Sequence, residues 1–218
     1  MRIIEGILFE PVGCLAEFPP EAFNEVAVRL FDRRKKASES ASWSYWHLLN
    51  LMDAAAGKLG VAEREIAEGL EVQAVEGASP YEDVVPALSE LKTMGVKLVI
   101  ASSLSGRAVA RFLEKFSLND FFSSVWSRDT AGGVKSAPLS NALNSASFKP
   151  EHVMFLTDTA EGLRVAKAVG VNSILMINDP DEARRLAMRD PAGGIVSLHE
   201  LPDFIRVVAA ENAKLSHS

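Results

Sequence analysis

The sequence predicts a doubly wound α/β fold, in which helices cover both faces of a parallel sheet and a small all-helical domain follows the first strand. Two observations predict it. From Ser79 onward, short apolar runs alternate with amphipathic helical patterns, as expected for right-handed βαβ units. Between residues 16 and 79, only helical patterns occur. The predicted domains are therefore an α/β core, residues 1–15 and 80–218, and a helical domain, residues 16–79.

The first strand is predicted from residues 3–9, an apolar run that is too short for a helix and is followed at once by Pro11 and Gly13. Such a run is typical of a strand that is buried on both faces of a parallel sheet. Open α/β sheets bind their ligands beyond the carboxyl ends of the strands. We therefore expect Glu10 to be the first polar side chain that reaches this crevice.

The helical domain is predicted to contain three helices and no strand. The first follows Pro19 and Pro20, and its apolar residues recur at helical spacing. The second contains Trp43 and Trp46, and the third covers residues 62–75. We interpret the aromatic residues as the core of a small helical bundle rather than as a platform on which bases stack.

The core domain is predicted to continue with helices and strands in alternation. Helices are expected at residues 81–95, 107–116 and 161–169, directly after Lys135, and from Leu201 onward. Strands are expected at residues 96–101, 121–126, 152–156, 172–177 and 195–196. Glycines follow two of these helices, where a residue past the helix end commonly takes a left-handed conformation.

The composition disfavours several classes of protein. Of 218 residues, 48% are apolar and 24% are charged, which is consistent with a folded core rather than with disorder. The net charge of −6 disfavours nucleic acid and anionic membranes as partners. A single cysteine, Cys14, excludes an internal disulfide and fits a reducing compartment. Without a long apolar run or a signal-peptide pattern, we expect a cytoplasmic protein.

Polar side chains occur at four successive junctions of the predicted core: Glu10, Ser102, Lys135 and Asp158. The two carboxylates suit Mg²⁺, which prefers oxygen ligands. The lysine and the hydroxyl suit phosphoryl oxygens, together with backbone N–H groups at the helix start after Ser102. Taken singly, a serine here is usually a helix cap, a lysine is usually solvated and an aspartate is usually a turn residue. Their order across four junctions favours a phosphate and magnesium site.

Four segments of the chain resemble the haloacid dehalogenase superfamily, in particular its phosphatase branch related to phosphoglycolate phosphatase and β-phosphoglucomutase. The segments are residues 79–102, 134–143, 153–170 and 193–202. The resemblance implies a Rossmann-like core with a helical cap at residues 16–78, and Mg²⁺-dependent hydrolysis of small phosphorylated molecules. It assigns phosphate binding to Ser102, Ser103 and Lys135, and metal binding to Asp158. Thr157 occupies a neighbouring position that is sometimes acidic in this family.

The first motif departs from the family pattern. Residues 9–15, FEPVGCL, stand where the family has F-D-x-D-G-T-L. Glu10 occupies the position of the aspartate nucleophile, and Val12 occupies the position of the acid–base aspartate. Glu10 also matches a metal ligand, and so does the backbone carbonyl of Val12. Cys14 replaces a threonine, and we expect it to be buried as a small apolar residue.

These substitutions leave three hypotheses. The favoured one is a phosphate- and Mg²⁺-binding protein of this family with a weakened metal site and with weak or no hydrolysis. The second is an active phosphohydrolase that uses Glu10, with an acid such as Glu17 supplied by the cap. The third is an interaction protein with no ligand in the cleft. Nicotinamide binding is disfavoured because no strand is followed by G-x-G-x-x-G. Dehalogenase activity is disfavoured because it also needs the aspartate nucleophile. Substrate and oligomeric state stay open.

Overall fold

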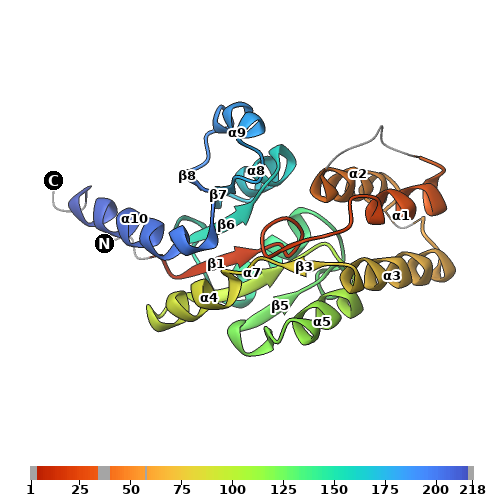
Figure 1. The fold of residues 1–218 in the computed structure, drawn as a ribbon, viewed down its shortest axis with the longest axis horizontal. Helices are drawn as coiled ribbons and strands as arrows, with labels where there is room; N and C mark the ends of the chain where they lie inside the picture. Colours follow the sequence, from red (N-terminus) through yellow and green to blue (C-terminus); the bar gives the residue numbers. More distant parts are fainter. Residues whose placement is uncertain (1–3, 34–39, 57, 216–218) are drawn as a thin grey trace.

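A computed structural model describes residues 4–33, 40–56 and 58–215 of the chain. Its centre is a parallel sheet with the strand order β5-β4-β1-β6-β7-β8. The strands are β1 (Gly6–Phe9), β4 (Lys97–Ala101), β5 (Ser124–Trp126), β6 (Val153–Thr157), β7 (Asn172–Met176) and β8 (Gly193–Ile195). Helices cover both faces of the sheet, so the predicted doubly wound α/β fold is confirmed (Figure 1).

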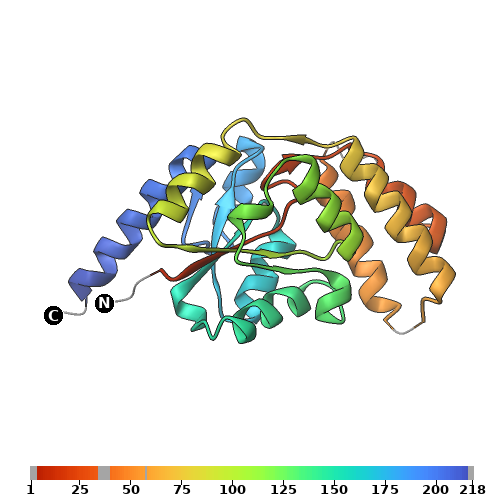
Figure 2. The same cartoon turned by 90° about the horizontal axis from the view of Figure 1, so that it is seen from below.

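Helices divide between the two faces according to the direction in which the chain crosses the sheet. One face carries α4 (Val84–Thr93), α5 (Gly106–Lys115) and α10 (Leu201–Leu215), and the other carries α7 (Ser136–Ser145) and α8 (Ala160–Ala168) (Figure 2). This distribution follows from right-handed crossovers in both directions from the central strand. Within the described ranges, no helix combines the length and the apolar character needed to cross a membrane.

Three helices form a separate group beyond the carboxyl ends of the strands (Figure 1). They are α1 (Ala22–Phe31), α2 (Ala41–Ala54) and α3 (Val61–Glu76), and we call them the helical layer. Within it, α1 packs against both α2 and α3, and α3 packs against α5 of the core. Two two-residue strands, β2 (Ala16–Glu17) and β3 (Ser79–Pro80), pair antiparallel where the chain enters and leaves the layer. The division into two domains stays a prediction.

The sequence missed several short elements. β2 lies inside residues 16–79, where no strand was expected, and its two residues carry no periodicity that could reveal it. Two short helices, α6 (Arg128–Ala131) and α9 (Pro180–Ala187), were also missed. For α9 the signal was present, because Asp179 caps the backbone N–H of Asp181 and Pro180 stands in the first turn. The three-residue helical turns are η1 (Asn119–Phe121), η2 (Pro150–His152) and η3 (Leu198–Glu200).

Several predicted boundaries were too wide. β1 begins at Gly6 rather than at Ile3, which lies outside the described residues. α4 begins at Val84 rather than at Tyr81, and β5 begins at Ser124 because the three residues before Phe122 form η1. The last strand was instead misplaced, because it spans Gly193–Ile195 rather than residues 195–196. Each of these differences lies at an element end, where tertiary contacts decide the local conformation.

A buried ion pair joins the helical layer to the core. The Glu71 side chain on α3 is fully buried, and its two carboxylate oxygens accept hydrogen bonds from the Arg128 guanidinium at 2.7 and 3.0 Å. The same carboxylate accepts the backbone N–H of Ser105 at 2.9 Å. Because bidentate geometry and an additional donor satisfy the charge, removing one partner would leave the other charge uncompensated in the interior.

We predict that Glu71→Ala lowers the free energy of unfolding by roughly 3–5 kcal/mol, because it leaves the Arg128 guanidinium, whose side chain is only 15% exposed, without its partner. The matched control is Glu90→Ala. Glu90 pairs with Arg206 at 2.6 Å, but both side chains are 48% exposed, so the expected loss is about 0–1 kcal/mol. Urea unfolding of both variants measures the difference. Equal losses would contradict the proposed importance of the buried pair.

Candidate functional site

The carboxyl ends of three neighbouring strands bring polar side chains to one edge of the sheet. β1 lies between β4 and β6, and its last residue pairs in register with Ile100 on one side and Leu156 on the other. Glu10, Ser102 and Asp158 directly follow β1, β4 and β6, respectively. All three side chains are buried, with Ser102 fully so. The helical layer covers this edge of the sheet.

Glu10 is held by donors from two parts of the chain. The Ser102 hydroxyl donates to Glu10 Oε1 at 2.6 Å, and the Ser103 backbone N–H donates to Oε2 at 3.2 Å. The Tyr45 hydroxyl, on α2, donates to the same Oε2 at 3.0 Å. The carboxylate is therefore fixed between the loop that follows β4 and a helix of the helical layer.

Burial changes the acidity of Glu10. Loss of hydration raises the pKa of this carboxyl from 4.5 to about 7, although hydrogen bonds from Ser102, Ser103 and Tyr45 and from the backbone of Val12 oppose the shift. Burial also raises the pKa of the Tyr45 hydroxyl, which therefore remains a proton donor at neutral pH. Near neutral pH, the Glu10 carboxyl is thus partly protonated.

The turn after β1 is tightly packed. Val12 is 1% exposed, so an aliphatic side chain fills the position where the resemblance places a proton-transferring acid. Gly13 has a φ of +75°, and a Cβ added to it would lie 2.1 Å from both Asp158 Oδ2 and Ser42 Oγ. Only glycine fits here, because the left-handed backbone and the close approach both exclude a side chain.

The side chains of Cys14 and Thr157 are buried and contribute to packing. Cys14 is fully buried, and its thiol donates to the Leu156 carbonyl at 3.5 Å. Burial raises the pKa of this thiol far above its usual range, so it stays protonated and unreactive. The Thr157 side chain packs against Gly162 of α8, where a Cβ would lie 1.9 Å from Thr157 Oγ1. Thr157 therefore supports the packing of α8 on β6 and adds no carboxylate to the site.

Lys135 pairs with the helical layer. Its ammonium Nζ donates to Asp53 Oδ2 on α2 at 2.8 Å, and its backbone N–H donates to Ser103 Oγ at 2.7 Å. Its φ of +59° places the residue in an unusual conformation directly before α7. The predicted lysine thus stands beside the predicted serine, while its charge is neutralised by Asp53.

Asp158 is 9% exposed and is held by neutral groups. Asn178 Nδ2 donates to Asp158 Oδ2 at 3.2 Å. Burial raises the pKa of the Asp158 carboxyl to about 6, while hydrogen bonds from Ser42 and Asn178 partly offset the shift. Two buried carboxylates therefore follow β1 and β6, and protein N–H and O–H groups satisfy oxygens of each.

The residues as arranged do not fit a Mg²⁺ ion. Both oxygens of Glu10 accept hydrogen bonds, and so does Oδ2 of Asp158. A magnesium ion needs these lone pairs in near-octahedral geometry. Across the described ranges, no group of three or more His, Cys, Asp or Glu side chains could hold a metal ion. Binding of Mg²⁺ through Glu10, Val12 and Asp158 stays a prediction that this donor arrangement does not favour.

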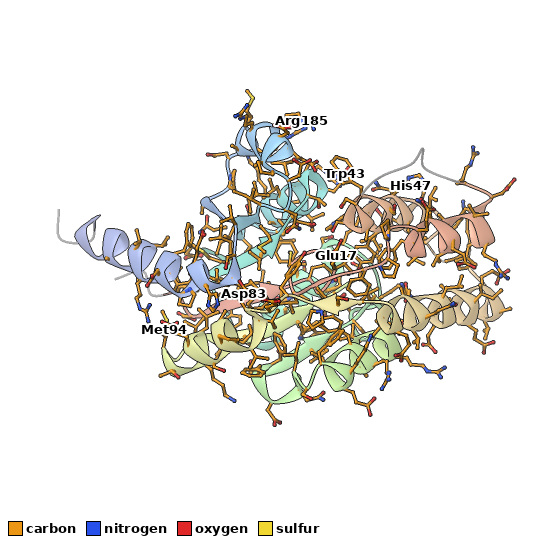
Figure 3. The ribbon with its side chains drawn as sticks, viewed as in Figure 1. Glu17, Trp43, His47, Asp83, Met94 and Arg185 are labelled. Carbon is orange, nitrogen blue, oxygen red and sulfur yellow. The ribbon has the colours of Figure 1, made fainter. Side chains whose placement is uncertain are left out.

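A pocket of about 490 Å³ opens beside Asp158. Its lining includes four carboxylates, those of Glu17, Asp158, Asp179 and Glu182, together with Tyr81 and Asn178. Across the pocket, Trp43 of α2 reaches toward α9 and donates to Glu182 Oε2 at 3.0 Å (Figure 3). A cleft lined by negative charge repels anions. This pocket therefore disfavours a phosphate ester on the Asp158 side of the site.

Sequence reasoning missed four residues that shape the site: Ser42, Tyr45, Asp53 and Asn178. The first three lie on α2, whose helical pattern was interpreted only as a bundle core. Nothing in that pattern indicates which side chains face the core domain. Asn178 follows β7 directly after Ile177, and its place at a strand end was the one signal that could have indicated it.

The comparison with protein families gives one matching model, described as haloacid dehalogenase-like hydrolase. It matches residues 50–176, more than half of the 218-residue chain. The matched range includes Ser102, Lys135 and Asp158 and begins after Glu10 and Val12. The match therefore covers the predicted site residues that follow the helical layer and leaves out the first motif.

Curated relatives include phosphatases. Over 125 residues, the chain is 29% identical to enolase-phosphatase E1 of Danio rerio, covering 56% of this chain and 48% of that protein. Over 123 residues, it is 28% identical to phosphoglycolate phosphatase 1 of Pseudomonas aeruginosa, covering 56% of this chain and 45% of that protein. The chain thus spans about half the length of the curated relatives it matches.

Solved structures share the fold over nearly the whole chain. A putative haloacid dehalogenase-like hydrolase from Bacteroides fragilis superimposes with a TM-score of 0.70 at 18% identity, covering 90% of this chain and 99% of that chain. CbbY from Rhodobacter sphaeroides, solved in complex with phosphate, gives a TM-score of 0.65 at 21% identity, covering 91% and 96%. At sequence identities this low, the similarity shows that the fold is shared.

We predict that Glu10→Gln flattens the pH dependence of stability. The pKa of Glu10 is raised from 4.5 to about 7 in the folded state, so the folded state binds the proton more tightly than the unfolded chain does. The free energy of unfolding therefore falls as pH rises through this window. Between pH 5 and pH 8, the unchanged chain should lose on the order of 2 kcal/mol more than the variant.

Glutamine is a suitable replacement because its amide oxygen can accept from Ser103 and Tyr45, while its amide nitrogen can donate to the Ser102 hydroxyl. Glu63→Gln, at an exposed position of α3, is the control for the removal of one carboxylate. Urea unfolding at a series of pH values gives the measurement. An equally steep profile for Glu10→Gln and for the unchanged chain would show that burial does not shift Glu10.

Proposed function

This chain belongs to the haloacid dehalogenase-like hydrolase family, and on that premise we propose that it is a phosphatase-related member that hydrolyses phosphomonoesters weakly or not at all. It would then act as a binding or regulatory protein. One observation carries the proposal. The carboxylate at the nucleophile position, that of Glu10, accepts hydrogen bonds on both oxygens from Ser102, Ser103 and Tyr45.

Nucleophilic attack on phosphorus requires a free carboxylate oxygen in line with the leaving group. The additional methylene of glutamate moves its carboxylate by about 1.5 Å relative to aspartate, and a misplacement of roughly 1 Å can lower the rate on the order of 10²-fold. The hydrogen bonds hold the Glu10 carboxylate between the loop after β4 and the Tyr45 hydroxyl of α2. Hydrogen bonds to both oxygens lower the nucleophilicity of the carboxylate and oppose its reorientation toward phosphorus, and the raised pKa of Glu10 further lowers the fraction of ionised nucleophile.

The second element of the proposal is Val12. This side chain is buried and carries no ionisable group, so it cannot protonate a leaving group or activate water. Loss of general acid–base catalysis typically costs ~10²–10⁴ in rate. The two losses do not simply multiply, because residues that act as one catalytic unit have non-additive effects.

The favoured hypothesis also includes the binding of phosphate and Mg²⁺. The phosphatase names of the relatives support a small phosphorylated molecule as the ligand class. In this chain, however, such a ligand competes with Glu10 for Ser102 and Ser103 and with Asp53 for Lys135. The same contacts favour a second candidate, a protein that acts through interactions and holds no ligand in this cleft.

We predict that the unchanged chain turns over a panel of phosphomonoesters with Mg²⁺ at rates near the uncatalysed background. Glu10→Asp combined with Val12→Asp should raise the rate on the order of 10²-fold or more, because it shortens the carboxylate and supplies an acid. Release of inorganic phosphate under steady-state conditions measures both.

The matched control is Glu10→Asp combined with Val12→Asn, which has the same size but no transferable proton at position 12. It should fall well below the double-aspartate variant. Ordinary enzymic turnover by the unchanged chain, together with a phosphorylated Glu10 trapped during turnover, would instead establish the hypothesis that Glu10 is a working nucleophile.

A further inference from the structure

Three donors surround the Glu10 carboxylate, and we call them the oxyanion cradle: the Ser102 hydroxyl, the Ser103 backbone N–H and the Tyr45 hydroxyl. We propose that the cradle is a small-oxyanion site that is permanently filled by the chain's own Glu10 carboxylate. It would take a free carboxylate such as acetate once Glu10 is shortened to alanine. This inference deepens the proposed function and rests on it, because a cradle filled from within holds no substrate phosphate.

When the Glu10 carboxyl is ionised, the direction of each hydrogen bond is fixed by its surroundings. The Leu104 backbone N–H donates to Ser102 Oγ at 3.2 Å, so the Ser102 hydroxyl proton is directed to Glu10. The backbone N–H of Ser103 can only donate. Tyr45 donates as well, since its hydroxyl stays protonated. Three donors therefore converge on one carboxylate, which is the geometry of an anion site.

The cradle is rigidly built. Ser102 and Tyr45 are fully buried, and Ser103 and Glu10 are 3% and 4% exposed. The Tyr45 ring packs against Phe23 with ring centres 4.8 Å apart and against Trp46 at 6.3 Å. Because packing and further hydrogen bonds hold these donors, they should keep their positions when the occupant is removed. A vacated cradle then presents unsatisfied buried donors, which favour binding of a replacement anion.

Neighbouring donors are also occupied by carboxylates of the chain. The Ser105 backbone N–H donates to Glu71 at 2.9 Å, and the Gly106 backbone N–H donates to Asp129 at 2.7 Å. The Lys135 ammonium is paired with Asp53. The donors that the sequence suggested for a phosphate are therefore satisfied by acidic side chains of the same molecule. Shortening Glu10 opens the cradle alone and leaves these neighbouring pairs in place.

The test uses chemical rescue. Glu10→Ala deletes one methylene and the carboxylate, and acetate has the same size and charge as the deleted atoms. Melting temperatures are measured with about 100 mM sodium acetate and with sodium chloride at equal ionic strength. A ligand that binds only the folded state stabilises it, so acetate should raise the melting temperature of Glu10→Ala by about 2–4 °C. The unchanged chain should show no rise.

Two further variants test the location of binding. Glu10→Gln keeps the full side-chain length, so its cradle stays filled and acetate should have no effect. Adding Ser102→Ala to Glu10→Ala removes one donor and should abolish most of the acetate-dependent rise. If Glu10→Ala does not fold, Glu10→Ser with formate is the second pair, because serine leaves a small polar group near the donors.

Two results would overturn the inference. One is a folded Glu10→Ala or Glu10→Ser variant that gains no stability from its carboxylate. The other is an unchanged chain that is stabilised by acetate or inorganic phosphate in a way that Ser102→Ala removes, because the cradle would then be open. This proposal and the proposed function fail on different measurements: ligand-dependent melting decides the first, and phosphomonoester turnover decides the second.

Discussion

The hydrogen bonds between Glu10 and the oxyanion cradle are the constraint on which the rest of the site depends. A carboxylate that leaves water needs donors to compensate for its lost hydration, and Ser102, Ser103 and Tyr45 supply them. The additional methylene of glutamate lets the carboxylate reach these donors from the end of β1. Under the proposed function, the same reach takes the carboxylate out of the position of a nucleophile, so that stability and the proposed loss of hydrolysis have one physical cause.

Ion pairs and hydrogen bonds also join the helical layer to the core. Glu71 of α3 binds Arg128 and the loop after β4, and Lys135 binds Asp53 of α2. Lys115 on α5 donates to three backbone carbonyls at and just beyond the end of α3, those of Val75, Glu76 and Ala78. These bonds join α5 to the backbone at the end of α3, where helix carbonyls lack partners within the helix. Polar contacts from both α2 and α3 therefore join the layer to the core at the strand ends.

The part of the chain that shows the family differs from the part that carries the first motif of the candidate site. The family is established by residues 50–176, and the fold is shared with solved structures over nearly the whole chain. The residues on which the proposed loss of hydrolysis rests, Glu10 and Val12, follow β1 and lie outside the matched range. A fold holds its sheet through burial that many sequences can supply, whereas phosphoryl transfer needs an oxygen within a fraction of an ångström. The fold can therefore persist after the chemistry is lost.

The features that could be predicted are those that leave a local pattern in the sequence. The apolar runs of β1, β4 and β6 and the helical spacing of α1 to α3 indicated the fold, because burial on one or both faces leaves a periodicity in the sequence. Motif order indicated Glu10, Ser102, Lys135 and Asp158 as candidate site residues. Short elements such as β2 and α6 escaped prediction because two to four residues are too few to show a periodicity.

The sequence by itself determined the doubly wound α/β architecture and the presence of glutamate and valine where its family resemblance places two aspartates. Only the tertiary structure decided which partners those side chains have. Tyr45 and Glu10 are 35 residues apart, and Asp53 and Lys135 are 82 residues apart. No local pattern encodes such contacts, because they arise when α2 is packed over the strand ends and its inward side chains meet the loops of the sheet.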